Sequence, residues 1–102
     1  MPELSCTIRR VGDFESRTEE YEISYAVGDM RPRGLRIKYQ AARAYEINAA
    51  LDAAVETARG AISQADPRLE GPTDEALSQF TWRAIQAAKY EEGETRASRL
   101  GL

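Results

Sequence analysis

The chain has 102 residues, of which 42% are hydrophobic and 30% charged, a balance typical of one small folded domain and not of a disordered segment. Its formal charge is −3, and the acidic excess lies in residues 44–102, which argues against nucleic-acid binding by the chain as a whole. The single cysteine, Cys6, excludes an internal disulfide framework and a cysteine-based zinc site, and favours a reducing compartment.

Three segments alternate apolar and polar residues with a period of two, which is typical of strands with one buried and one solvated face. They cover residues 4–9, 21–27 and 35–40. Gly12 opens the first connection, which continues to Glu20, and Gly28 and Gly34 bracket the second. Because consecutive strands tend to pair, these segments predict an antiparallel meander. Residues 35–40 run without a breaker into a helical pattern, so they are either the third strand, which we favour, or the first turns of the helix.

A helical period follows from residue 41 onward. Apolar residues at spacings of three and four predict a first helix that ends at Asp66-Pro67. Gly60 within it marks either a close contact with another element or an earlier end of the helix. On the polar side of this helix, Glu56 and Arg59 have a spacing that lets them interact.

Thr73 is the predicted N-cap of a second helix, which we expect to end near Gly93. Its main apolar stripe consists of Leu77, Phe80, Ala84 and Ala88. The sequence therefore predicts an α+β fold in which a three-stranded antiparallel meander is followed by two α-helices packed on one face. Residues 1–93 form this single domain, and residues 94–102 form a polar, frayed C-terminal tail.

The sequence offers little to support catalysis. It has no histidine, which removes the commonest general base and the commonest metal ligand. Cys6 falls in the inward register of the first strand, where a buried structural thiol is expected and a nucleophile is not. No acidic run has calcium-loop spacing, and no glycine-rich loop opens a helix to hold a phosphate. We therefore predict no catalytic residue, no metal site, no cofactor and no enzymatic activity.

A basic patch is predicted in the first half of the chain. Its members are Arg9, Arg31, Arg33, Arg36 and Lys38, from the outward register of the sheet and the second connection. Such a patch either binds phosphates or an acidic protein, or is a solvated face whose charges discourage association at strand edges. It has no interleaved aromatic residues of the kind that stack on single-stranded bases, and this favours the solvated face.

A second apolar face is predicted on the helices. Helical geometry places Trp82 and Ile85 away from the main stripe of the second helix, and Tyr45 off the main stripe of the first. Such a face is either wedged between two layers or offered to a partner. Because tryptophan and tyrosine are frequent anchors of interfaces, we take these three residues as the candidate protein interface.

These patterns favour a small non-catalytic intracellular protein that acts by binding another protein or a second copy of itself. Adaptors, regulators and inhibitors carried by phages or other mobile elements fit this description. The alternative is a nucleic-acid-binding module that uses the basic patch. The sequence shows neither a signal-peptide pattern nor a long apolar run, so we expect a cytoplasmic protein without a membrane partner.

Overall fold

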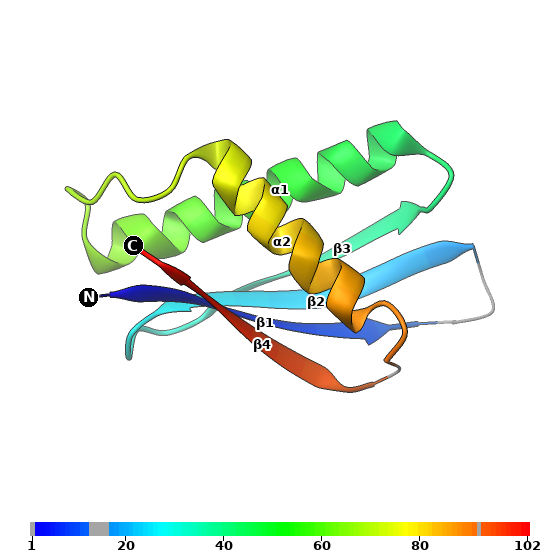
Figure 1. Ribbon diagram of the computed structural model, residues 1–102, viewed down its shortest axis with the longest axis horizontal. Coiled ribbons are helices and arrows are strands. Elements are labelled where there is room, and N and C mark those ends of the chain that lie inside the picture. The colour runs from blue at the N-terminus through cyan, green and yellow to red at the C-terminus, as the bar shows by residue number, and fades with distance from the viewer. Residues whose placement is uncertain (1, 13–16, 92) are drawn as a thin grey trace.

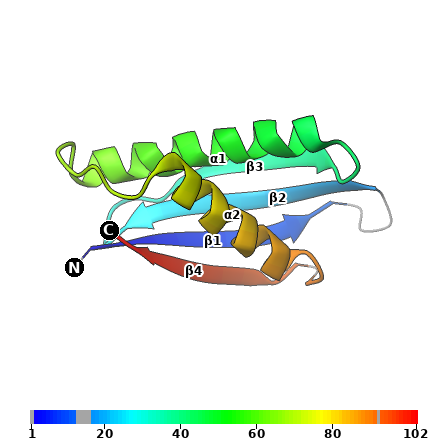
Figure 2. The same cartoon turned by 45° about the horizontal axis from the view of Figure 1, so that its top comes forward.

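The computed structural model describes residues 2–12, 17–91 and 93–102. Within these ranges the chain forms β1 (Glu3–Val11), β2 (Thr18–Val27), β3 (Arg33–Gln40), α1 (Ala44–Ala65), α2 (Asp74–Ala88) and β4 (Thr95–Gly101). The strands make one antiparallel sheet in the order β3-β2-β1-β4, and the helices cross one of its faces (Figures 1 and 2). The α+β class with an antiparallel sheet and two helices is confirmed, but the described residues add a fourth strand to the predicted three.

The fourth strand is the segment predicted to be a frayed tail. β4 pairs with β1, and Leu100 lies opposite Leu4 on the side that faces the helices. The Leu102 N–H also donates to the Pro2 carbonyl at 3.1 Å, which ties the two ends of the described chain together. β4 lies at the edge of the sheet, where most of its side chains are exposed. The prediction of a frayed tail is therefore wrong. The sequence does not reveal this strand, because an edge strand buries too few side chains to show clear alternation.

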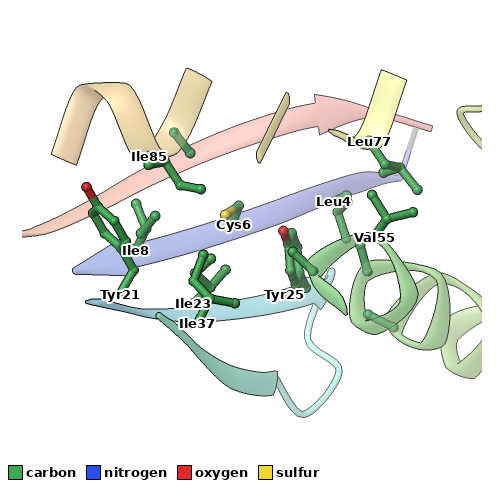
Figure 3. Packing of buried hydrophobic residues seen from close by; sticks show 14 of the residues in the cluster. Leu4, Cys6, Ile8, Tyr21, Ile23, Tyr25, Ile37, Val55, Leu77 and Ile85 are labelled. Atoms are coloured by element: carbon green, nitrogen blue, oxygen red, sulfur yellow. The ribbon is translucent and has the colours of Figure 1, made fainter. Parts of the chain in front are cut away.

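The alternation in the other strands matches the burial seen in the structure. In β2, every second residue from Glu19 to Val27 is buried. Residues 35–40 belong to β3, so the strand interpretation is confirmed over the helical one. Residues 13–16 of the predicted first connection lie outside the described ranges, and from Thr18 onward that segment is already β2. Side chains of the sheet meet those of both helices in one hydrophobic core (Figure 3).

Gly60 lies inside α1, at a close contact between the helix and the sheet. A Cβ atom at this position would lie 2.7 Å from Nη1 of Arg33. The guanidinium of Arg33 reaches along the helix, where its Nε donates to Oε1 of Gln64 at 2.8 Å. The close-contact interpretation of Gly60 is therefore confirmed, and α1 continues to Ala65. No helix in the described part of the chain is both long and apolar enough to cross a membrane.

α2 begins where the sequence predicts but buries a different face. Thr73 is its N-cap, with Oγ1 accepting from the Ala76 N–H at 3.1 Å. The helix ends at Ala88, before Gly93, which takes a φ of 73° between α2 and β4. The buried residues of the helix are Leu77, Thr81, Ala84, Ile85 and Ala88. The predicted stripe was centred too far toward Phe80, which is only partly buried.

A buried hydrogen bond explains why the face of α2 is shifted. The hydroxyl groups of Tyr25 on β2 and Thr81 on α2 lie 2.5 Å apart, and both residues are fully buried. Each hydroxyl satisfies the other, so a polar side chain occupies a core position at little cost. With Thr81 facing the sheet, Ile85 one turn later must face it too.

Candidate functional site

The predicted interface residues do not share one surface. Tyr45 is 68% exposed near the start of α1. Trp82 is partly buried, with one side packed against the core. Ile85 is fully buried and extends from α2 toward the sheet (Figure 3). Its place in the predicted interface is therefore wrong, because the rotation of α2 that buries Thr81 also brings Ile85 into the core.

Trp82 lines a groove between α1 and α2. This apolar end of the groove has a volume of about 330 Å³, and its apolar lining residues are Ile47, Leu51 and Trp82. Ser78 also lines a second hollow between the same helices, so the two hollows adjoin at this residue. We call the two hollows together the α1–α2 groove. Figure 2 shows the two helices diverging along their length.

The second hollow is acidic and larger, with a volume of about 620 Å³. Its charged lining residues are Asp52, Glu56, Arg59, Asp74 and Glu75. The carboxylates on α1 are four residues apart, so they lie on the same side of the helix. Asp74 and Glu75 lie in the first turn of α2, where the helix dipole favours carboxylates, and no spacing in the sequence places them opposite α1.

Arg59 holds the acidic end of the groove together. Its Nε donates to Oδ1 of Asp74 at 2.8 Å, and its Nη1 donates to the Glu70 carbonyl at 2.9 Å. Its Nη2 donates to the Pro72 carbonyl. The predicted interaction with Glu56 is replaced by these bonds, since a guanidinium can donate to several acceptors in one plane. Arg59 thus fixes the connection between the helices, a role that no local spacing in the sequence indicates.

The outward-facing members of the predicted basic patch are largely neutralised. Nη2 of Arg9 donates to Glu22 at 2.5 Å, and Arg36 donates to both Glu22 and Glu20. These arginines lower the pKa of the Glu22 carboxyl below its ordinary value, Arg9 most strongly. Lys38 lies directly opposite Glu20 in the register of β2 and β3. This part of the sheet is therefore a ladder of alternating charges, in which two carboxylates offset most of the positive charge of the three basic residues.

The remaining members of the patch lie elsewhere. Arg33 contacts α1 through Gln64, on the opposite side of the sheet from Arg36. Arg31 is exposed in the turn between β2 and β3. The five basic residues therefore do not form one face, because the strand begins at Arg33 and its alternation sends Arg33 and Arg36 to opposite sides.

Cys6 is fully buried in β1, as expected from its register. Burial raises the pKa of its thiol from 9.0 to about 12, and a hydrogen bond with Tyr25 opposes this rise only in part. Burial likewise raises the pKa of Tyr39 from 10.0 to about 12. These groups stay protonated in the folded protein at pH values where an unfolded chain ionises them.

The fold is therefore expected to lose stability in alkali. Above pH 9 the unfolded chain releases the Cys6 proton and the folded chain retains it, so the free energy of unfolding falls as pH rises from 9 to 12. For Cys6 alone the loss at pH 10.5 should be about 2 kcal/mol. Urea unfolding of the native protein and of Cys6→Ala at pH 8 and pH 10.5 measures it. A pH dependence that is equal in the two proteins would contradict this assignment.

A buried polar cluster joins β1, β2, β3 and the end of α2. Tyr21 donates to Glu19 at 2.7 Å, and both side chains are buried. The rings of Tyr21 and Tyr39 stack with their centroids 6.2 Å apart. Arg10, which is 9% exposed, donates to the Lys89 carbonyl at 2.5 Å, just beyond the last turn of α2. A cation beside the free carbonyls of a helix end is stabilising, so this cluster anchors α2 to the sheet.

Among the described residues, no three acidic, cysteine or histidine side chains are placed to hold a metal ion together. Searches against models of protein families, curated proteins and solved structures found no match to this chain, so its function has to be inferred from its own side chains.

Proposed function

We propose that the protein is a non-catalytic binding protein whose α1–α2 groove holds a segment of another protein. The observation that supports this proposal most is the apolar end of the groove, where Trp82, Ile47 and Leu51 line an open hollow. Tryptophan is enriched among the residues that carry most of the binding energy in protein interfaces. Tyr45 is 68% exposed near the start of α1 but does not line the groove, so the proposal does not depend on it.

Action as an adaptor, regulator or inhibitor in the cytoplasm is consistent with this proposal. A second copy of the chain is one partner that the same groove would accept. The nucleic-acid alternative has less support, because Arg9 and Arg36 are paired with carboxylates and Arg33 lies on the helical side of the sheet. Phosphate binding by this sheet face would have to break those ion pairs first.

The test is capture of partners from cells that make the protein, followed by mass spectrometry. The baits are the native chain, Trp82→Ala and Tyr90→Ala. Tyr90 is a matched control, since it is an aromatic residue that is 84% exposed and does not line the groove. We expect a partner that is retained by Tyr90→Ala and lost, by about tenfold or more, with Trp82→Ala, as for an interface hot spot.

Because Trp82 also packs against the core, its removal changes stability as well as the groove. Ser78→Arg is a second variant, which fills the middle of the groove without removing a core side chain. Circular dichroism should show that it folds as the native chain does. A partner that binds Ser78→Arg and Trp82→Ala as tightly as the native chain would disprove binding in the groove.

A further inference from the structure

We propose that the segment held in the α1–α2 groove is a basic amphipathic helix. Its apolar side chain enters the end near Trp82, and its lysine or arginine side chains face the acidic end. This inference rests on the proposed function, because it names the chemistry of the partner for the same site.

The charges of the groove carry the first step. Asp74 is bonded to Arg59, but Asp52, Glu56 and Glu75 have no cationic partner in the described part of the chain. The hydrogen bond that Glu75 accepts, from Gln79 at 3.5 Å, brings no charge. On the open face of the sheet, by contrast, Glu22 is paired with both Arg9 and Arg36. The groove is thus a place where negative charge collects without compensation, and a cationic segment complements it.

The spacing of the lining residues along α1 and α2 indicates that the bound segment is a helix. The lining residues of α1 recur in pairs at every turn, from Ile47 to Arg59, and those of α2 do the same from Asp74 to Trp82. Two such helical stripes, diverging around this groove, offer the kind of surface into which an amphipathic helix packs. The stripe on α1 is about 18 Å long, which matches about three turns of a bound helix.

The distance between the apolar and acidic ends of the groove determines the spacing expected between the apolar anchor and the basic residues of the partner. From Leu51, in the apolar end, to Glu56, in the acidic end, the rise along α1 is about 7–8 Å. A bound helix would span this distance in one to two turns. The partner should therefore carry Lys or Arg about four and seven residues from its apolar anchor. An acidic segment or a nucleic acid would meet unpaired carboxylates and be repelled.

The test uses two capped 15-residue peptides of alanine and leucine with one apolar face. One carries two lysines at the spacings given above, and the other carries glutamates at the same positions. Trp82 is the only tryptophan of the chain, so its fluorescence reports on occupancy of the groove itself. We expect the lysine peptide to shift this emission with a Kd that rises with salt, and the glutamate peptide to leave it unchanged.

Two triple variants separate the groove from the general charge of the protein. The groove variant is Asp52→Asn with Glu56→Gln and Glu75→Gln, and the control is Glu3→Gln with Asp29→Asn and Glu94→Gln. Both remove three carboxylates, and the control positions lie outside the groove. The groove variant should weaken the lysine peptide by about tenfold or more at low salt, and the control by less than about threefold. Equal weakening by both variants would overturn the inference.

The outcomes also separate this inference from the proposed function. If the glutamate peptide shifts Trp82 emission as readily as the lysine peptide, the basic preference is wrong, whereas the groove still binds protein segments. If neither peptide shifts it at millimolar concentration, the basic helix is wrong, and partner capture that depends on Trp82 then decides whether the groove binds at all. If the protein without peptide sediments faster as its concentration rises, a second copy of the chain is the occupant instead.

Discussion

Deletion of residues 94–102 is expected to abolish cooperative folding. The deletion removes β4 and turns β1 from a central strand into an edge strand. It breaks the backbone ladder between β1 and β4 and removes Leu100 and Leu102, which pack against the core. At about 0.5–1.5 kcal/mol for each lost backbone bond, the total approaches the stability of a whole small domain. Far-UV circular dichroism and urea unfolding measure the loss.

Point variants in β4 distinguish a strand from a frayed tail without shortening the chain. Leu100 faces the helices and Arg99 faces the open side of the sheet. Leu100→Ala should lower the free energy of unfolding by about 1–3 kcal/mol, and Arg99→Ala by less than about 0.5 kcal/mol. If neither change affects stability and the truncated chain unfolds as the native one does, residues 95–101 are not a strand in solution.

Ile85→Ala is expected to be among the most damaging single substitutions in α2. Ile85 is fully buried at the contact between α2 and the sheet, so its loss leaves a cavity that the rigid strands below cannot fill. The expected cost is about 2–5 kcal/mol in the free energy of unfolding. The expected result opposes the prediction from the sequence, in which Ile85 belongs to an exposed interface.

Two neighbours serve as controls for Ile85. Gln86 is exposed, and its replacement by alanine should change stability by less than about 0.5 kcal/mol. Trp82→Ala should cost less than Ile85→Ala, because Trp82 is only partly buried, yet it alone should affect binding in the groove. Chemical unfolding of the three variants ranks them by free energy of unfolding. A protein that tolerates Ile85→Ala as well as Gln86→Ala would show that α2 packs with a different face.

Much of the fold was predictable because its signals are local. Alternation in β1 to β3 follows from one face being buried, the C-terminal end of α1 follows from Asp66-Pro67, and the start of α2 follows from Thr73. β4 was missed because an edge strand buries little, although Leu100 and Leu102 at a spacing of two were a faint sign of it. The face of α2 was misplaced because hydrophobicity favours Phe80 over Thr81, and only the partner hydroxyl of Tyr25 reverses that order.

Of the residues that line the candidate site, the sequence predicted only Trp82. Trp82 stands out in the sequence as a tryptophan off the main apolar stripe of its helix. The groove around it could not be predicted, because it depends on which side of α1 faces α2. Asp52 and Glu56 look like ordinary solvated charges until α2 lies beside them. The basic patch failed for a similar reason, since Glu20 and Glu22 on the neighbouring strand neutralise Arg36. Cross-element pairing of this kind has no signature at a fixed sequence spacing.

The position of β1 has a consequence for the order of events in folding. β1, β2 and β3 are consecutive, so they can pair as soon as they have been synthesised. The other side of β1 is filled by β4, and Leu4 must wait for Leu100, its partner across the ladder. Contacts so distant along the chain form slowly, because a long loop must close before they stabilise anything. Until β4 pairs with β1, the growing chain exposes the free edge of β1. A β-strand from another chain can pair with this edge most easily during that interval.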